Sequence, residues 1–415
     1  MEMNELFYKN TYLREFDAEV ISCTPIHTAE SPRFEVILDD TAFYPEGGGQ
    51  PADRGILKMN GENSVQDSTF SADGYSDGLT VHVQDVQRRA DDVIVHYTDA
   101  PLPEGAAVHG KIDWARRFDL MQNHSGEHII SGLVHAHYGY ENVGYHMGDD
   151  VITIDLSGPL TWDQLMEIER EANGRVYENL PIEITYPSEE ELKNIQYRSK
   201  KELTGRVRIV TIPDTDVCAC CGTHVARTGE IGLIKCLSMI HYKGGVRITM
   251  ASGGRALRIM EQRTDIVNDL AKQLAVDPAL VLDGFARVKE ESFEKSRRIG
   301  EIMTMYYGAR ADALPDGRKL TMEFEDSMTP VEARRFCEFL LEHGKGTCCA
   351  VFTKQGEGWY YVIGSRSIDV RPLVKTANAA LSGRGGGKPE MAQGTMAAPR
   401  EEIEAELIRF TSAEE

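Results

Sequence analysis

Short β-branched and apolar runs follow one another through the first part of the chain. Glycine, proline and aspartate separate them, as they separate strands joined by turns. The runs are "AEVISCTPI", "RFEVILDD", "LTVHVQDV", "DVIVHYTD" and "AAVHGKID". This pattern predicts a small β-barrel over residues 1–113.

The pattern changes to a helical period in "DWARRFDLMQNHSGEHIISGLVHAHYG", where apolar positions include Phe118, Met121, Ile129 and Leu133. A second helix, in "TWDQLMEIEREANGRVYENL", opens with Thr161 and Gln164 at the spacing of a capping box. The expected strands are "VITIDLS", "PIEITYP", "VRIVTIP", "IGLIKCLSMI" and "GGVRITMAS". Residues 114–253 are therefore predicted to form an α/β sandwich.

A long helical region is expected over residues 254–315. Its apolar positions Ile259, Ile266, Leu270 and Leu274 recur at spacings of seven and four. A new helix begins at "DPALV", with Asp277 as its N-cap, and runs to about Ala313. Two long helices with a short connection indicate an antiparallel hairpin or an arm used for dimerisation.

Strand and helix patterns alternate over residues 316–415. We expect a strand over 320–324, a helix over 329–343, two strands around "KQGEG", another helix, a glycine loop and a last helix. This is a small separate α/β domain, so the fold class of the whole chain is α+β.

Composition narrows the functional classes. The net charge of −21 over 415 residues argues against a protein that coats nucleic acid nonspecifically. The basic stretch "KNIQYRSKKELTGRVRI" is interpreted as a solvated face. No apolar run approaches a membrane span, no secretory signal is visible, and the clustered cysteines favour a reducing cytoplasm.

Two motifs nearly a hundred residues apart carry candidate metal ligands. In "QNHSGEH", the spacing of four puts His124 and His128 on one face of a helix. Read alone, H-x-x-E-H is also a zinc peptidase signature with Glu127 as general base. "VCACCGTHV" adds Cys220 and His224 in a turn, which weakens the peptidase interpretation.

Three histidines and one thiolate are typical of a zinc site. Cys218 and Cys221 lie close enough in the sequence to compete with Cys220 as the sulfur ligand. The pattern does not separate a catalytic zinc from one that only clips a helix to a strand.

A glycine-rich segment, "AFYPEGGGQPADRGIL", provides the third element. Gly47, Gly48 and Gly49 allow positive φ and close approach of a ligand, and successive backbone N–H groups can hold an oxyanion or phosphate. The alternative is a flexible hairpin turn.

In this order, "EGGGQPADRG", "NHSGEH" and "CCGTHV" resemble the editing module of alanyl-tRNA synthetases and the free-standing AlaX editing proteins. The segment "LSGRGGGKPEMAQGT" resembles the DHH-associated domain at the end of those synthetases, as in the long AlaX form. The resemblance implies hydrolysis of tRNA(Ala) mischarged with serine or glycine. It also implies His124, His128, Cys220 and His224 as zinc ligands, with Gly47–Gln50 lining the amino-acid end of the cleft.

Candidate catalytic and specificity residues lie within or next to these motifs. Glu127 is the nearest candidate base, the alternative being an ordinary carboxylate on the helix surface. Gln50 and Thr41 are the polar groups nearest the glycines and could bond a serine hydroxyl, which alanine would leave unpaired. Both could equally be fillers at strand ends.

Several expected absences complete the hypothesis. The barrel begins within the first residues, so we expect editing without aminoacylation. "GRGGGKP" departs from a P-loop at Ser382 and Pro389, which favours an ATP-independent reaction, and no Asp-His-His triplet occurs. The C-terminal domain is expected to contact tRNA or to dimerise. The alternatives left open are a tRNA-binding protein with a structural zinc and a zinc peptidase.

Overall fold

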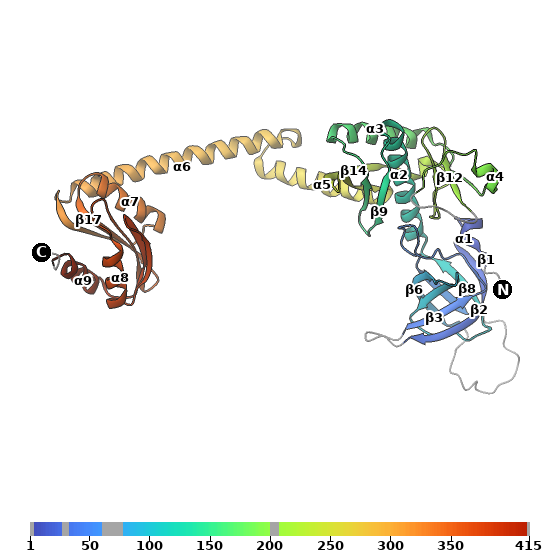
Figure 1. Cartoon of the computed structure of the whole chain (residues 1–415), viewed down its shortest axis with the longest axis horizontal. Helices are drawn as coiled ribbons and strands as arrows, with labels where there is room; N and C mark the ends of the chain where they lie inside the picture. Colours follow the sequence, from blue (N-terminus) through green and yellow to red (C-terminus); the bar gives the residue numbers. More distant parts are fainter. Residues whose placement is uncertain (1–3, 27–32, 60–77, 200–206, 413–415) are drawn as a thin grey trace. The chain divides into compact units, whose positions relative to one another are not determined.

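A computed structural model describes residues 4–26, 33–59, 78–199 and 207–412. The chain divides into two compact units, Met1–Asp269 and Leu270–Glu415 (Figure 1). The first contains a closed barrel and an α/β layer with antiparallel sheets, and the second contains a five-stranded mixed sheet. The predicted α+β class and N-terminal barrel are confirmed, whereas the finer domain boundaries stay predictions.

Six strands close the barrel in the order β2-β3-β7-β6-β5-β8. Their bounds are Glu15–Ile26 (β2), Arg33–Leu38 (β3), Gly55–Met59 (β5), Thr80–Arg88 (β6), Ile94–Thr98 (β7) and Ala107–Ile112 (β8). Strand β5 was not predicted from the sequence, although it closes the barrel between β6 and β8. Before and beside the barrel lie β1 (Asn4–Glu5), α1 (Leu6–Lys9) and β4 (Asp40–Thr41).

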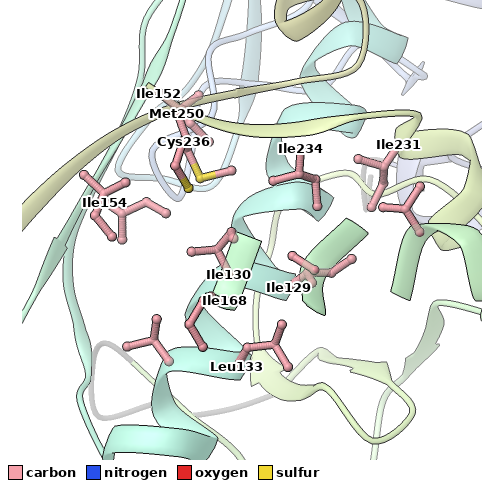
Figure 2. Close-up of a cluster of buried hydrophobic side chains, with 14 of the residues drawn as sticks. Ile129, Ile130, Leu133, Ile152, Ile154, Ile168, Ile231, Ile234, Cys236 and Met250 are labelled. Atoms are coloured by element: carbon pink, nitrogen blue, oxygen red, sulfur yellow. The ribbon is translucent and has the colours of Figure 1, made fainter. Parts of the chain in front are cut away.

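Helix α2 (Trp114–Tyr138) follows the barrel directly. The Asp113 side chain caps its first turn, and Gly139 ends it in the left-handed conformation. Its apolar side chains Ile129, Ile130 and Leu133 face a core shared with a four-stranded sheet (Figure 2). Because this core is close-packed, α2 is held at a fixed depth against the sheet.

The four-stranded antiparallel sheet has the order β14-β15-β10-β9. Its strands are β9 (Asn142–Met147), β10 (Ile152–Leu156), β14 (Ile234–Tyr242) and β15 (Gly245–Ser252). Helix α3 (Trp162–Glu178) packs beside α2, and its predicted capping box between Thr161 and Gln164 is confirmed. The sheet core therefore includes Ile168 of α3 as well as Ile154 of β10 (Figure 2).

A smaller sheet supplies the segment that leads into the cysteine-rich turn. Its order is β11-β12-β13, with β11 at Glu183–Thr185, β12 at Ile209–Ile212 and β13 at Asp216–Ala219. The short helix α4 (Glu189–Leu192) lies between β11 and β12 in the sequence, and η1 (Thr228–Ile231) follows β13. Strand β13 contacts α2, so the turn after β13 is delivered next to the histidines of that helix.

The predicted arm helices are confirmed as elements. Helix α5 spans Gly253–Leu274, and α6 spans Val281–Asp312 after the short turn η2 (Pro278–Leu280). Asp277 caps this turn by accepting a hydrogen bond from Ala279, as the sequence predicts. Whether the two helices form a hairpin or a dimer arm stays a prediction.

The C-terminal sheet has the order β16-β17-β18-β20-β19. Its elements are β16 (Arg318–Glu325), α7 (Pro330–Glu342), β17 (Gly346–Gln355), β18 (Gly358–Ser365), α8 (Arg371–Ala380), β19 (Arg384–Lys388), β20 (Met391–Met396) and α9 (Arg400–Ser412). The expected glycine loop was wrong, because "RGGGK" is strand β19. A Cβ on Gly385 would lie 2.3 Å from the carbonyl oxygen of Gln393, so the missing side chain permits pairing with β20.

Over the described parts of the chain, no helix is both long enough and apolar enough to cross a membrane.

Candidate metal centre

Four side chains from two distant segments converge in the first unit. Helix α2 supplies His124 and His128, and the turn after β13 supplies Cys220 and His224. The candidate ligand atoms of these residues all lie within 4.8 Å of one another. The two motifs singled out in the sequence are therefore brought together in space.

Hydrogen bonds orient all three imidazoles through Nδ1. His124 donates to Oε1 of Gln50 at 2.9 Å, and His128 donates to Asp216 at 2.8 Å. Nδ1 of His224 lies 3.2 Å from Oγ of Ser125. Such partners fix which nitrogen is left for a metal, here Nε2 in each ring.

Nε2 of His224 is buried and has no hydrogen-bond partner among the described residues. A buried polar atom without a partner is costly, and a metal ion would satisfy it. Nε2 of His124 lies 3.4 Å from Sγ of Cys220, so the sulfur and the ring nitrogens face a common centre. The donor set of three imidazoles and one thiol fits zinc.

Electrostatics distinguish Cys220 from its neighbours. Burial opposes ionisation of Cys220, but the histidines His124 and His128 outweigh it and bring the pKa of the thiol well below its usual range. Burial raises the pKa of Cys218 to about 11, and it also raises the pKa of Cys221. Cys220 is therefore the thiol most readily present as the thiolate that a metal requires.

Burial lowers the pKa of His224 to about 3, with a further contribution from the neighbouring His124. For His128, burial acts in the opposite direction to the net shift, because Cys220 and Asp216 raise its pKa well above the usual value. The pKa of His224 is thus lowered and the pKa of His128 is raised, so the clustered groups together hold few protons. A divalent cation would replace those protons.

The basic stretch has two residues inside the fold, so the solvated-face interpretation was wrong for them. Arg198 pairs with both carboxylate oxygens of Asp216, at 2.8 and 2.9 Å, and thereby supports the partner of His128. Arg208 donates to the carbonyls of Cys220 and Gly222 and holds the ligand turn. Lys200, Lys201 and Arg206 lie outside the described residues.

The glycine motif forms a tight turn. Gly47 and Gln50 exchange two backbone hydrogen bonds, and the intervening Gly48 and Gly49 have φ of 62° and 85°. Positive φ at both central positions is what a type I′ turn requires. A Cβ on Gly48 would meet no atom within 4 Å, whereas one on Gly49 would lie 2.6 Å from the ring of Tyr145.

Gln50 connects this turn to the metal cluster. Its Oε1 accepts from His124 and from the backbone N–H of Thr223, and its Nε2 donates to Oγ1 of Thr223. The side chain is fully buried. This geometry favours a positioning role for Gln50, and a direct catalytic role stays a prediction.

The residues that follow Gln50 make contacts with the first turns of α2. A buried ion pair joins Asp53 to Arg117, and the backbone N–H of Asp113 donates to the carbonyl of Arg54. Arg117 also donates to two backbone carbonyls, of Thr11 and Ala42, which satisfies a charge that would otherwise be costly to bury. Residues 50–54 thus attach the barrel to the helix that carries two candidate ligands.

Glu127 is only 2% exposed, so the alternative of a surface carboxylate was wrong. Its Oε1 accepts hydrogen bonds from Ser131, at 2.5 Å, and from Asn142. Its Oε2 lies 4.0 Å from Nε2 of His128. A carboxylate beside the candidate metal centre is thereby held in one orientation.

Thr41, on β4 beside the barrel, is buried, and its hydroxyl contacts Nε2 of His96 at 2.8 Å and accepts from the N–H of Phe43. Nδ1 of His96 donates to the carbonyl of Val36. The Thr41 hydroxyl is therefore engaged within the barrel, and its role toward a substrate stays a prediction.

The sequence analysis missed the groups that support the ligands. These are Asp216, Ser125, Thr223 and Tyr145, whose ring stacks on His124 with centroids 5.4 Å apart. Ser125 and Thr223 stand beside ligands inside the two motifs, which was an available signal. Asp216 and Tyr145 carry no such signal, because only the tertiary fold brings them to the histidines.

Three family models match the chain in order. Residues 14–116 match tRNA synthetases class II (A), residues 207–249 match the threonyl and alanyl tRNA synthetase second additional domain, and residues 316–412 match the DHHA1 domain. A relative from Pyrococcus horikoshii, alanyl-tRNA editing protein AlaX-L, is 29% identical and aligns over 97% of this chain and 96% of its own length.

The chain is similar, along nearly its whole length, to the AlaX family of alanyl-tRNA editing proteins. It resembles the long members of this family, which the sequence motifs predicted.

Other relatives are longer than this chain. An alanine–tRNA ligase from Halorubrum lacusprofundi is 34% identical over 77% of the chain, which spans only 33% of that protein. The alanyl-tRNA editing protein Aarsd1 from Bos taurus is 32% identical over 64% of the chain and 58% of its own length. The similarity to AlaX-L therefore covers a larger share of this chain, and a larger share of the relative, than the similarity to these two proteins.

Proposed function

We propose that this protein hydrolyses the ester bond of tRNA(Ala) mischarged with serine or glycine and that it depends on zinc. One observation carries the proposal: Gln50 of the glycine turn is hydrogen-bonded to His124 of the metal cluster. The Gln50 side chain thus connects the glycine turn, whose backbone could bind a ligand, to the candidate metal site. The names of the relatives AlaX-L and Aarsd1, both alanyl-tRNA editing proteins, support the reaction class.

His124, His128, Cys220 and His224 would hold the zinc through three Nε2 atoms and one sulfur. Zinc in such a site supplies Lewis acidity that orients and polarises a substrate group or water. Four protein ligands would fill a tetrahedral coordination sphere, so the attacking water would lie outside it, and the zinc would polarise a substrate group only by accepting it as an additional ligand. The Asp216 and Ser125 hydrogen bonds support this set by orienting His128 and His224.

Glu127 would act as the general base of the hydrolysis. Its carboxylate is anchored by Ser131 and Asn142 and lies beside His128. It would take a proton from the attacking water, whose oxygen forms a bond to the ester carbon. The bond from that carbon to the ribose oxygen then breaks, and the proton passes to the ribose oxygen, giving free amino acid and tRNA.

The glycine turn would receive the acylated ribose. The open space beside Gly48 supports close approach of a ligand to the backbone. Thr41 and Gln50 remain the candidates for discriminating serine from alanine. A serine hydroxyl that hydrogen-bonds to a buried polar group adds binding free energy, whereas alanine leaves that group unpaired and binds less tightly. The free cysteines of the described chain support a reducing, cytoplasmic setting.

The decisive experiment incubates the purified protein with Ser-tRNA(Ala), Gly-tRNA(Ala) and Ala-tRNA(Ala) and measures ester loss without added nucleotide. We expect loss of serine or glycine and retention of alanine. Binding of tRNA without ester loss would favour a non-catalytic protein with a structural zinc, and chelator-sensitive peptide cleavage would favour a peptidase. The absence of aminoacylation stays a prediction, tested by adding ATP, alanine and uncharged tRNA.

A further inference from the structure

A groove of about 670 Å³ crosses the outside of the barrel over strands β6, β5 and β8. The strand register aligns His82, Ile56 and Lys111 in one row, since Ile56 pairs with His82 on one side and with Lys111 on the other. Arg33 and Arg54 also line the groove. Four of its lining residues thus carry basic side chains.

The two arginines have no carboxylate partner within the described residues. Asp113 is the one acidic residue among those lining the groove, and its side chain is engaged as the N-cap of α2. Lys111 is paired with Glu15 at 2.8 Å, so it contributes less. Arg33 and Arg54 are exposed. Two guanidinium groups without an ion pair among the described residues give this groove a local positive charge on a chain with a net charge of −21.

A third guanidinium adds to this cluster. Arg116, in the first turn of α2, donates to the carbonyl of Ala52 and has no ion pair among the described residues. Burial and the neighbouring Arg54 lower the pKa of Arg116 and outweigh the opposite effect of Asp149 and Asp53. Arginines that disfavour one another's charge are held close together, and an anionic ligand would relieve their repulsion.

The groove lies within reach of the metal centre. Arg54 is four residues beyond Gln50, which contacts His124, and its carbonyl accepts from Asp113 at the start of α2. An extended segment of four residues spans roughly 13 Å. Along α2, Asp113 and His124 are separated by roughly 16 Å of helix. These spans correspond to a few nucleotides of a single strand.

We propose that this groove binds the phosphodiester backbone of the single-stranded 3′ end of the tRNA, upstream of the acylated terminal nucleotide. The inference rests on the proposed function. The whole protein repels a polyanion, so a local basic groove leading to the site provides both attraction and direction. Arg33 and Arg54 contact phosphates in this arrangement, and neither takes part in the hydrolysis.

The test compares wild type with the double variant Arg33→Gln/Arg54→Gln. Binding of a fluorescein-labelled single-stranded RNA ending in CCA is measured by anisotropy over a range of KCl concentrations. The affinity should fall about tenfold, and the slope of log affinity against log salt should become shallower by about 1.4, since each single-strand phosphate contact contributes about 0.7. Equal affinity and equal slope for the two proteins would overturn the proposal.

A matched control removes the same charge elsewhere in the first unit. Arg89→Gln/Arg170→Gln replaces two exposed arginines, one after β6 and one on α3. It should bind RNA as wild type does. If it weakens binding as much as the groove variant, net charge alone is responsible and the groove is not the site.

Kinetics then separate this proposal from the proposed function. The groove variant should raise KM for Ser-tRNA(Ala) about tenfold with little change in kcat. It should hydrolyse 3′-O-seryl adenosine, which lacks upstream phosphates, at the wild-type rate. A wild type that hydrolyses neither substrate would refute the proposed function, while the RNA-binding comparison would still decide the groove. Loss of seryl adenosine hydrolysis in the variant would refute a role limited to phosphate binding.

Discussion

Nδ1 of His124 donates a hydrogen bond of 2.9 Å to Oε1 of Gln50, across the boundary between barrel and α2. The same oxygen accepts from the backbone of Thr223, in the turn that supplies the other two candidate ligands. One amide therefore touches the glycine turn, the helix and the cysteine-rich turn. Loss of this amide should therefore alter the positions of the glycine turn, of His124 on α2 and of the cysteine-rich turn.

Replacing this amide tests the connection. Gln50→Met keeps the length of the side chain but removes the acceptor that fixes the His124 tautomer. We expect zinc affinity to fall about 10- to 100-fold, the usual effect of losing such a partner. Competition with a fluorescent chelator measures it. Gln87→Met, the same change on β6 away from the cluster, should retain wild-type affinity; a similar loss there would count against the interpretation.

The ligand set predicts about one zinc per chain. Elemental analysis of His124→Ala/Cys220→Ala should find little or none, because two of four ligands are gone. His135→Ala is the control, since His135 lies on the same helix but pairs with Glu141 at the surface. Unchanged zinc in the double variant would exclude this assignment.

The glycine turn makes a separate prediction. Gly48→Val adds a side chain at φ of 62°, with strain of roughly 1 kcal/mol or more, and fills the space proposed for the ribose. Deacylation of Ser-tRNA(Ala) should fall by orders of magnitude while zinc content and Tm stay near wild type. Gly105→Val has φ of 77° and equally open surroundings, so it should carry the strain without the loss of turnover. Retained activity in folded Gly48→Val would remove the turn from the site.

Most of the helices and strands could be predicted from the sequence because they depend on local patterns, whereas the pairing of the two distant ligand motifs was implied by the family resemblance. Helical spacing put His124 and His128 on one face, and turn chemistry marked the glycines. Strand β5 was missed, and β19 was expected as a loop. Short, glycine-containing strands carry little local signal, and their pairing is decided by neighbours distant in the sequence.

The supporting contacts were beyond local reasoning for the same reason. Arg198 and Arg208 occur in a run of basic residues, which usually indicates solvent exposure. Each is instead held by a partner 12 to 18 residues further along the chain, Arg198 by Asp216 and Arg208 by the carbonyls of Cys220 and Gly222. A run of basic residues indicates solvent exposure only when the fold offers those side chains no carboxylate or carbonyl to bond.

A buried histidine in the barrel predicts acid sensitivity. Burial lowers the pKa of His96 to about 4, below its ordinary value of 6.5. The folded state therefore binds fewer protons than the unfolded state between these values. The contribution is complete above pH 6.5 and is lost as pH falls toward 4, by an amount on the order of 3 kcal/mol.

Urea unfolding of zinc-free protein at pH 7 and pH 4.5 measures this effect. His96→Gln should be less stable at pH 7 but should lose less of its free energy of unfolding on acidification. Protonation of the metal-site residues is common to both proteins and cancels in the comparison. Parallel pH profiles for the two proteins would contradict the prediction.

The two compact units predict a division of labour. A chain ending at Asp269 should fold, bind zinc and hydrolyse Ser-tRNA(Ala), with a raised KM if the second unit adds tRNA affinity. Ending it at Gly254 would instead remove Arg255, which is buried and pairs with Asp119. A folded, zinc-loaded chain ending at Asp269 that shows no hydrolysis even at saturating tRNA would assign chemistry to the second unit.

The segment from Gln50 to Arg54 has a mechanical consequence. It is attached to α2 at both ends and at the Asp53–Arg117 ion pair between them. Any rotation of the barrel against the helix would have to break a fully buried ion pair and the hydrogen bond to the candidate ligand His124 at the same time. Rotation of the barrel relative to α2 therefore has a high free-energy cost. A ligand must reach the site by movement of side chains and of the glycine turn, while the barrel and α2 keep their relative positions.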